Sequence, residues 1–293
     1  MAMVNCDYLE KVLASVRELA NLAFAEDMPE GDVTAEVMGL QARQAKAHII
    51  TREPVPMCGA AWYEEVVDAY RRHNPTAQIQ VTCLAQDGKR LKAGSVLFEL
   101  EGDAASIVGL ERTLLNFVGR GIGIASATAV YVDAVTNDRT RILDTRKTLP
   151  GFRYFDKYAV LCGGGANHRL NLSDQVLIKE NHLARFGGVA AAVAHVRENL
   201  TRPVEIQIEV DTFDQLLEAI EAECPLIMLD NFTPETVKRA CELTRGSCRL
   251  EVSGGITLDN MQAYLHPLLD RISIGALTHS VKAPDLSLLI TED

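Results

Sequence analysis

From residue 141 onward, short segments rich in β-branched residues alternate with helical patterns, and this alternation constrains the fold more than any other feature. The expected strands are 141–144, 175–179, 204–210, 226–229, 249–252 and 272–274. The helical patterns between them are 189–199, 213–222, 234–244 and 258–265. Such alternation produces parallel strands joined by crossover helices. We therefore expect a closed or nearly closed α/β barrel, with an open doubly wound sheet as the second possibility.

The first third of the chain has a different pattern. Residues 7–26 carry apolar side chains at helical spacing, and a second helical pattern covers 104–118. Between them lie three β-rich segments, at 46–51, 78–84 and 95–100. We expect a small α+β unit here, before the barrel begins.

Composition excludes several classes of function. The chain has 293 residues, of which 47% are hydrophobic and 24% charged, which is enough for one large or two modest globular domains. Its net charge of −11 argues against binding nucleic acid or anionic lipid as the main activity. We expect no membrane span and no signal peptide. The seven cysteines form no C-x-x-C pair, so we expect reduced thiols and a cytoplasmic location.

Polar residues follow nearly every expected strand. Barrels and open parallel sheets both place their active residues at the carboxyl ends of the strands. The residues found there are Asp144, Thr145, Arg146, Lys147, Lys179, Glu209, Asp230, Ser253, Gly254 and Gly275. Solvated loops would account for one or two such charges, but not for a charge or glycine after almost every strand. We therefore expect an active site at this edge.

The charge in this half of the chain points to an anionic ligand. Residues 141–185 contain eight basic and four acidic residues, although the whole chain is acidic. A basic site within an acidic protein favours a small polyanion, and arginine suits carboxylate and phosphate groups. Glycines after the last two strands, at 254–255 and 275, are typical of the phosphate site of a barrel. The chain has neither a G-x-G-x-x-G motif after a strand nor a P-loop.

Glu209 and Asp230 end neighbouring expected strands. Two carboxylates that face phosphates commonly hold Mg²⁺, although carboxylates at strand ends can equally be paired with nearby Lys or Arg. No zinc-binding or serine-hydrolase motif is present. The residues alone thus predict an α/β barrel enzyme that uses Mg²⁺ on a phosphorylated, multiply anionic small molecule, and they leave the reaction open.

Several of these segments together resemble the quinolinate phosphoribosyltransferase family. They include Glu-Arg-Thr at 111–113, Asp-Thr-Arg-Lys-Thr at 144–148 and Gly-Gly-Gly-x-Asn-His-Arg at 163–169. The remaining matches lie at 26–34, 115–117, 150–153, 157–160, 177–182, 209–211, 228–231, 253–256 and 274–280. They occur in the family's order from about residue 20 to the end. One departure is Gly-Ile-Gly-Ile-Ala at 121–125, where the family has a serine, and it puts that segment's backbone in doubt.

The resemblance implies a fold, an assembly and a reaction. The fold is an N-terminal α/β sandwich, over 1–118 and joined by 281–293, with an incomplete α/β barrel of the type II phosphoribosyltransferases over 119–280. The assembly is a homodimer or higher homo-oligomer with shared active sites. The reaction is a pentosyl transfer: quinolinate and 5-phosphoribosyl-1-pyrophosphate give nicotinate mononucleotide, pyrophosphate and CO₂ with Mg²⁺, in NAD biosynthesis.

The resemblance also implies roles for single residues. The cations expected to bind quinolinate are Arg112 (from the partner subunit), Arg146, His168, Arg169 and Lys179. Thr145 and Lys147 are expected to contact the substrates, and Glu209 and Asp230 to hold Mg²⁺–pyrophosphate and the ribose hydroxyls. The 5-phosphate is expected to be bound by Ser253, Gly254, Gly275 and His279. The residues expected to act in catalysis are Lys147, Lys179, Glu209 and Asp230.

Two alternatives stay open. The first is a sister enzyme of the same fold, either one that uses nicotinate or a relative encoded with molybdenum-transport genes. Nicotinate has a single carboxylate, so an enzyme for it would not need the cations expected here for a second one. A non-catalytic barrel that binds an anionic metabolite would tolerate loss of Lys179, Glu209 or Asp230, and all three are present.

Overall fold

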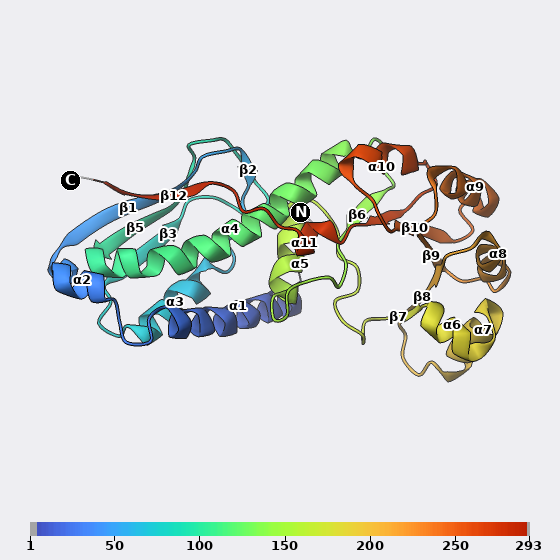
Figure 1. The fold of residues 1–293 in the computed structure, drawn as a ribbon, viewed down its shortest axis with the longest axis horizontal. Helices are drawn as coiled ribbons and strands as arrows, with labels where there is room; N and C mark the ends of the chain where they lie inside the picture. The colour runs from blue at the N-terminus through green and yellow to red at the C-terminus, as the bar shows by residue number, and fades with distance from the viewer. Residues whose placement is uncertain (1–4, 292–293) are drawn as a thin grey trace. The chain divides into compact units, whose positions relative to one another are not determined.

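The computed structural model describes residues 5–291, which form two compact units (Figure 1). The first unit comprises residues up to 129 together with 148–164 and the segment from 277, and the second comprises 130–147 and 165–276. Residues 1–4 and 292–293 lie outside the described residues, and with them the start of the region considered for a signal peptide. The predicted domain boundary at 118/119 falls inside a continuous helix.

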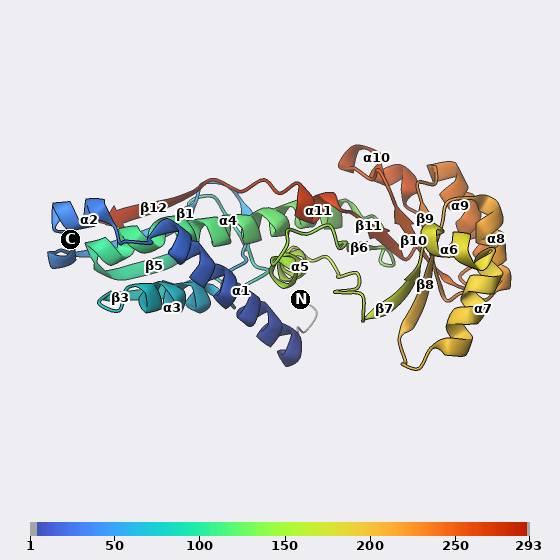
Figure 2. The same cartoon turned by 60° about the horizontal axis from the view of Figure 1, so that its bottom comes forward.

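An antiparallel sheet of four strands organises the first unit. Its order is β12–β1–β5–β3, from Leu286–Thr291, Gln44–Thr51, Val96–Asp103 and Ile79–Cys83. The last described strand, β12, pairs antiparallel with β1, so the C-terminal segment lies beside the first strand of the chain in one sheet (Figure 2). A short pair, β2 (Val55–Pro56) and β4 (Arg90–Leu91), lies apart from this sheet.

Helices complete the first unit. They are α1 (Cys6–Asp27), α2 (Val33–Met38), the 3-10 turn Leu40–Ala42, α3 (Tyr63–His73), α4 (Ala104–Ala134), α5 (Arg153–Cys162) and α11 (Ala276–His279). The predicted first helix is confirmed: Asn5 caps it by accepting from the Tyr8 N–H at 2.7 Å, and Val12, Val16 and Phe24 lie on its buried face.

Helix α4 is longer than predicted, because it continues for four turns past residue 118. Its glycines allow close packing: a Cβ on Gly123 would stand 2.5 Å from the Lys282 carbonyl oxygen. The doubtful segment at 121–125 is thus regular helix. By length and composition alone α4 could cross a membrane, but buried core helices pass the same test, and 72% of its apolar window is buried.

Aromatic packing forms the core beside α4. Trp62 is fully buried, as expected of a core residue, and its ring lies 5.0 Å from Phe155 and 6.2 Å from Phe117. The guanidinium of Arg120 donates two hydrogen bonds, of 2.8 and 2.7 Å, to the fully buried carboxylate of Asp156. This pair ties α4 to α5.

A parallel sheet of six strands forms the second unit. Its order is β6–β11–β10–β9–β8–β7, from Arg141–Leu143, Arg271–Ser273, Arg249–Ser253, Leu226–Asp230, Glu205–Val210 and Gln175–Ile178. Every predicted strand is present within two residues. Within the described residues the outermost strands, β6 and β7, do not pair with each other, so the barrel is incomplete, as expected.

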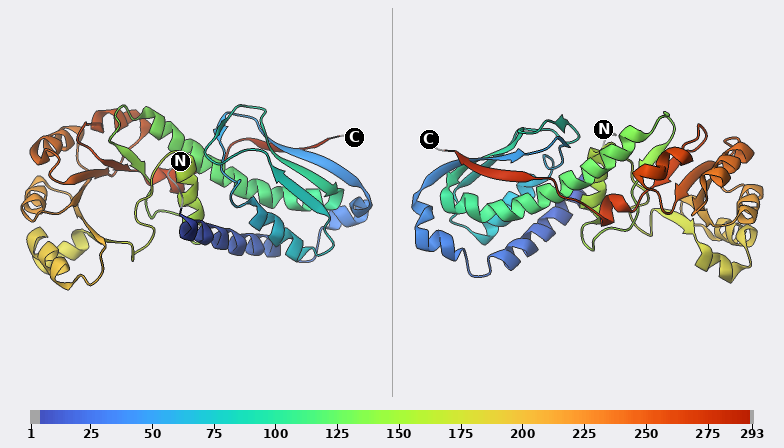
Figure 3. Two further views of the ribbon diagram at one scale, coloured as in Figure 1. Left: turned by 180° about the vertical axis from the view of Figure 1, so that it is seen from behind. Right: turned by 45° about the horizontal axis from the view of Figure 1, so that its top comes forward.

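Crossover helices cover the outside of these strands (Figure 3). They are α6 (Glu180–Phe186), α7 (Val189–Asn199), α8 (Phe213–Glu221), α9 (Pro234–Thr244) and α10 (Leu258–Tyr264). Thr233 and Thr257 cap α9 and α10, as their position before the helical patterns predicts. The strands are thereby anchored with their carboxyl ends at one edge.

Candidate active site

The carboxyl edge of the six-stranded sheet gathers most of the predicted site residues. They are Thr145, Arg146 and Lys147 after β6, Lys179 after β7, Glu209 in β8, Asp230 in β9, Ser253 and Gly254 at β10, and Gly275 after β11. Because parallel strands end at the same edge, residues up to 130 positions apart in sequence share one surface.

Lys179 and Glu209 form an ion pair, with Nζ 2.5 Å from Oε2. Both come from neighbouring parallel strands, and the lysine side chain is 45% exposed. The Lys179 N–H donates to Nδ1 of His182 at 2.9 Å in a capping box, which fixes the start of α6. The sequence alone left open whether the two carboxylates hold Mg²⁺ or pair with nearby Lys or Arg. For Glu209 the structure shows a pair with Lys179.

Asp230 lies in an unfavourable electrostatic position for a carboxylate. Burial and the neighbouring charge of Glu209 raise its pKa, while Lys179 and Lys147 act in the opposite direction. The Asn231 side chain donates to Asp230 Oδ2 at 2.8 Å. The charged form of Asp230 is therefore disfavoured in the folded protein.

The pair Glu209 and Asp230 fits a divalent cation that keeps several ligands from substrate or water. Within residues 5–291 no group of three or more His, Cys, Asp or Glu is arranged to hold a metal ion by itself. Mg²⁺ commonly uses only one or two carboxylates together with phosphate oxygens. Burial and then the charge of Glu209 raise the Asp230 pKa, and a bound cation would favour the charged form against both.

Gly254 is required where it stands. Its φ of +96° is a conformation that L-residues rarely adopt, and an added Cβ would lie 2.2 Å from Oδ1 of Asn231. Asn231 itself donates its N–H to the Ser253 carbonyl at 2.9 Å. The backbone after β10 is therefore pressed against the loop that carries Asp230.

Arg146 and Arg169 place two guanidinium groups near each other. Burial and the charge of Arg146 lower the pKa of Arg169, whereas Asp174 and Glu209 partly offset this. Arg169 Nη1 also donates to the Gln175 carbonyl at 3.2 Å. Two neighbouring guanidinium groups are suited to a ligand with more than one negative charge.

The loop that carries Arg169 is held by two buried carboxylates. Asp144, fully buried after β6, accepts from the Asn167 side chain at 2.5 Å and from the His168 N–H at 3.0 Å. Glu251 in β10 lies with Oε1 3.4 Å from His168 Nε2. Sequence reasoning did not single out Glu251, because its only signal is a charged residue within an apolar strand.

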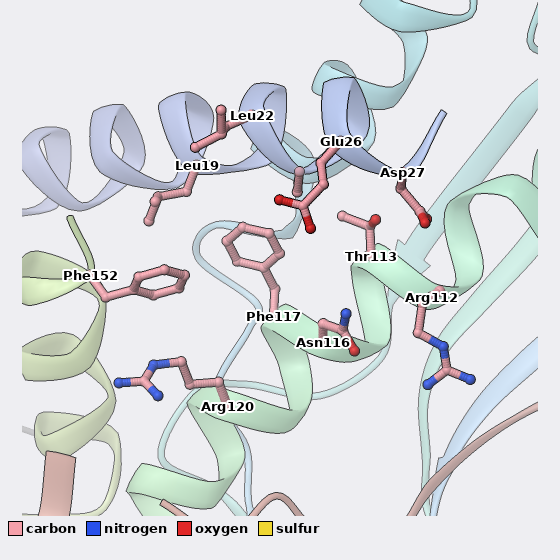
Figure 4. A pocket seen from close by; sticks show the side chains of 11 residues that line it. Leu19, Leu22, Glu26, Asp27, Arg112, Thr113, Asn116, Phe117, Arg120 and Phe152 are labelled. Carbon is pink, nitrogen blue, oxygen red and sulfur yellow. The ribbon is translucent and has the colours of Figure 1, made fainter. Parts of the chain in front are cut away.

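Arg112 and His279 belong to the first unit, so their contacts with this edge stay predictions. Arg112 is exposed on α4 and lines a hollow of about 390 Å³, which Figure 4 shows between α1 and α4. Phe117 points from α4 toward α1 in this hollow, and Glu26 lies at its rim. His279 Nδ1 lies 2.7 Å from the Ser280 hydroxyl.

Comparisons with known proteins agree with this architecture. Residues 32–121 match the family model of the quinolinate phosphoribosyl transferase N-terminal domain, and residues 124–289 match that of its C-terminal domain. A solved structure titled as the nicotinate-nucleotide pyrophosphorylase from Francisella tularensis superposes with a TM-score of 0.87. It is 39% identical and covers 95% of this chain and 96% of its own.

Curated relatives cover nearly the whole chain as well. A protein of Bacillus subtilis named as a probable nicotinate-nucleotide pyrophosphorylase (carboxylating) is 38% identical, over 94% of this chain and 93% of its own length. A carboxylating nicotinate-nucleotide pyrophosphorylase of Mycobacterium leprae is 37% identical, over 94% and 96%. The chain therefore belongs to the quinolinate phosphoribosyl transferase family of enzymes.

Proposed function

We propose that this enzyme transfers the phosphoribosyl group of 5-phosphoribosyl-1-pyrophosphate to quinolinate with loss of CO₂, giving nicotinate mononucleotide and pyrophosphate. The observation that carries the proposal is the array of cations and two carboxylates along the carboxyl edge of β6–β9 in a member of this family. The names of the Bacillus and Mycobacterium relatives state the same carboxylating pyrophosphorylase activity.

Quinolinate is a dianion, and the cations of the site match its two carboxylates. Arg146 and Arg169 lie near each other, and Arg169 is partly withdrawn from water, which strengthens its attraction for an anion. Lys179 stands at the end of the neighbouring strand β7. These residues bind and orient the substrate so that its ring nitrogen faces the ribose.

Glu209 and Asp230 are the residues that would hold Mg²⁺ with the pyrophosphate, and Ser253, Gly254, Gly275 and His279 those that would bind the 5-phosphate. When bound, the metal ion supplies charge neutralisation to the departing pyrophosphate. Lys179 would exchange its contact with Glu209 for one with substrate, since its side chain is nearly half exposed. Gly254 has no side chain where Asn231 lies, so the loop after β10 can stay close to the loop that carries Asp230.

The reaction has two steps. The pyridine nitrogen attacks the anomeric carbon while the bond to pyrophosphate breaks, so positioning and charge stabilisation carry the step. The ring then becomes a pyridinium. The adjacent carboxylate leaves as CO₂, its bonding electrons remain on the ring carbon, and a proton replaces it.

We further propose that two subunits share each site, with Arg112 acting on the partner's substrate. The observation in favour is that Arg112 is exposed and forms no hydrogen bond or ion pair within residues 5–291. Arg112→Ala and Lys179→Ala should each be inactive yet folded, and mixed dimers should regain up to about a quarter of the activity through one intact site. Mixed dimers without recovery would refute the shared site.

A substrate-swap assay tests the proposed reaction. The protein, Mg²⁺ and 5-phosphoribosyl-1-pyrophosphate are incubated with quinolinate or nicotinate, and nicotinate mononucleotide is measured by chromatography. We expect product from quinolinate only. Product from nicotinate alone would replace this proposal with the sister-enzyme reaction, and no product from either would favour a binding protein. Arg169→Lys is an informative variant, because it keeps the charge but loses the bidentate fork.

A further inference from the structure

A polar network fills the interior of the six-stranded sheet below the site. Gln207 of β8 donates from Nε2 to Glu251 Oε2 at 3.0 Å, and both side chains are fully buried. The other carboxylate oxygen, Oε1, lies 3.4 Å from His168 Nε2; neither of these two buried atoms makes a hydrogen bond of good geometry within residues 5–291, so each is the polar group nearest at hand to satisfy the other. His168 itself is only 8% exposed. The imidazole is thus buried, and its Nε2 lies on the side of the interior carboxylate of Glu251.

The other ring nitrogen of His168 shows which tautomer is present. The backbone N–H of Arg169 donates to His168 Nδ1 at 2.7 Å. A backbone N–H is always a donor, so Nδ1 must carry a lone pair rather than a proton. An imidazolium would set two N–H groups against each other at this distance. The proton of the ring therefore lies on Nε2, toward Glu251.

The charges around Glu251 do not require a protonated histidine. Arg271 Nη1 of β11 lies 4.0 Å from Glu251 Oε2, and Glu205 is paired with Arg249 at the other end of the barrel. Burial raises the pKa of Glu251 and the charge of Asp144 acts in the same direction, while Gln207, Ser273 and Arg271 partly offset both. Arg271 thus supplies positive charge near Glu251 without requiring a charge on His168.

We infer that Glu251 is a positioning residue: it accepts the Nε2–H of a neutral His168, whose Nδ1 in turn holds the backbone at Arg169. The quinolinate-binding part of this inference rests on the proposed function. On this view the cationic pocket consists of Arg146, Arg169 and Lys179, together with Arg112 of the partner subunit, and His168 orients Arg169 instead of adding a charge. What Glu251 must supply is a hydrogen-bond acceptor, not a negative charge.

Two variants of Glu251 show whether its role depends on a hydrogen-bond acceptor or on a negative charge. Glu251→Met removes both acceptors at similar size. Glu251→Gln keeps one acceptor, its amide oxygen, for His168. Gln207 Oε1 has no hydrogen-bond partner within residues 5–291. If the Gln207 amide rotates, this oxygen can accept from the new amide NH₂ of Glu251→Gln. Glu205→Met is a control for loss of a carboxylate near Arg271: Glu205 is partly exposed, pairs with Arg249, lies 3.9 Å from Arg271 and does not touch His168.

We expect Glu251→Met to raise KM for quinolinate about tenfold, the effect of one lost hydrogen bond to a buried group, with KM for 5-phosphoribosyl-1-pyrophosphate within about twofold. For Glu251→Gln, the KM values for quinolinate and for 5-phosphoribosyl-1-pyrophosphate should each stay within about threefold of wild type. Glu205→Met should leave the ratio of these two KM values unchanged. Glu251→Gln as damaging as Glu251→Met would show that the charge is needed and would overturn the inference. So would equal rises in both KM values for Glu251→Met.

Nitrogen NMR of the histidine-labelled wild-type protein tests the tautomer without any variant of Glu251. His168→Gln identifies the signals of His168 among the seven histidines. We expect a protonated Nε2 and an unprotonated Nδ1 at neutral pH, and two protonated nitrogens would overturn the inference even if Glu251→Met fails to fold. If the wild type does not consume quinolinate, the proposed function fails, and the ring spectrum still decides the state of His168.

Discussion

Replacing Gly254 by alanine should damage the site through one identifiable contact, the side chain of Asn231. The new Cβ would stand 2.2 Å from Asn231 Oδ1 and 3.0 Å from its backbone nitrogen, so the asparagine must move. Its hydrogen bond to Asp230 Oδ2 would then be lost. Gly255 offers the matched control, because it also has a positive φ, +61°, but an added Cβ there meets nothing within 4 Å.

The two substitutions therefore share backbone strain and differ in the clash. Left-handed backbone costs an L-residue about 1–2 kcal/mol, which is the full expected effect of Gly255→Ala. Gly254→Ala adds about 1–2 kcal/mol for the hydrogen bond that Asn231 gives up, so we expect about 2–4 kcal/mol in total. Because Asp230 loses its orienting partner, KM for 5-phosphoribosyl-1-pyrophosphate should rise about tenfold in Gly254→Ala only.

Urea denaturation gives the stability of both variants, and steady-state kinetics give KM for each substrate. The reasoning predicts that Gly254→Ala is the less stable and the only one with a raised KM for 5-phosphoribosyl-1-pyrophosphate. Equal stability losses and equal KM values in the two variants would refute it, because the contact with Asn231 would then have no consequence. Asn231→Gly in the Gly254→Ala background should remove the side-chain clash at a position whose φ of +57° suits glycine, and so recover part of the lost stability.

Three further predictions concern other charged pairs. Arg120→Met should lower the free energy of unfolding by about 3–5 kcal/mol in urea denaturation, because it leaves the buried Asp156 carboxylate without its cation. Adding Asp156→Asn should recover part of this loss. A loss under about 1 kcal/mol would contradict the prediction. Asp230→Asn should abolish Mg²⁺-dependent turnover but raise the melting temperature in EDTA at neutral pH, because the folded state raises the Asp230 pKa and its charged form is unfavourable there. That gain should vanish as pH falls below the unfolded value of about 3.9, and a variant less stable than wild type at pH 7 would refute the sign. Lys179→Met should lower the affinity for quinolinate in calorimetric titration more than Lys147→Met does; equal effects would contradict its placement.

Periodicity located the second unit well because its strands and helices obey simple rules. Helices α7 and α9 match the predicted ranges 189–199 and 234–244 residue for residue. The strands are short apolar segments whose ends coincide with the first polar or glycine residues, as in β9, which closes with Asp230. Local pattern and tertiary packing agree there, so the sequence is informative.

Elsewhere tertiary packing overrides the local signal. Helix α5 was not predicted, because Asp156 and Lys157 are charged yet fully buried and hide its apolar face. Helix α4 was expected to end at 118 but continues to Ala134, although Gly119, Gly121 and Gly123 are poor helix formers. In the structure these glycines pack closely against other segments, which sequence periodicity does not reveal.

In the candidate site, too, local sequence pattern predicted some features, and others depend on tertiary contacts. Strand-end positions identified Lys179, Glu209 and Asp230, and the structure brings them together at one edge. The ion pair of Lys179 with Glu209 was one of two open interpretations, because residues 30 positions apart carry no pairing signal of their own. Glu251 was missed for a similar reason: its partner, His168, lies on a loop before β7, and only the folded barrel joins them.

Release of labelled CO₂ tests the central claim most directly. Quinolinate carrying ¹³C in the 2-carboxylate is incubated with the enzyme, 5-phosphoribosyl-1-pyrophosphate and Mg²⁺, and ¹³CO₂ and pyrophosphate are measured together. The account predicts one labelled CO₂ for each pyrophosphate, with neither formed when 5-phosphoribosyl-1-pyrophosphate is omitted. Pyrophosphate without labelled CO₂, or labelled CO₂ without pyrophosphate, would contradict it.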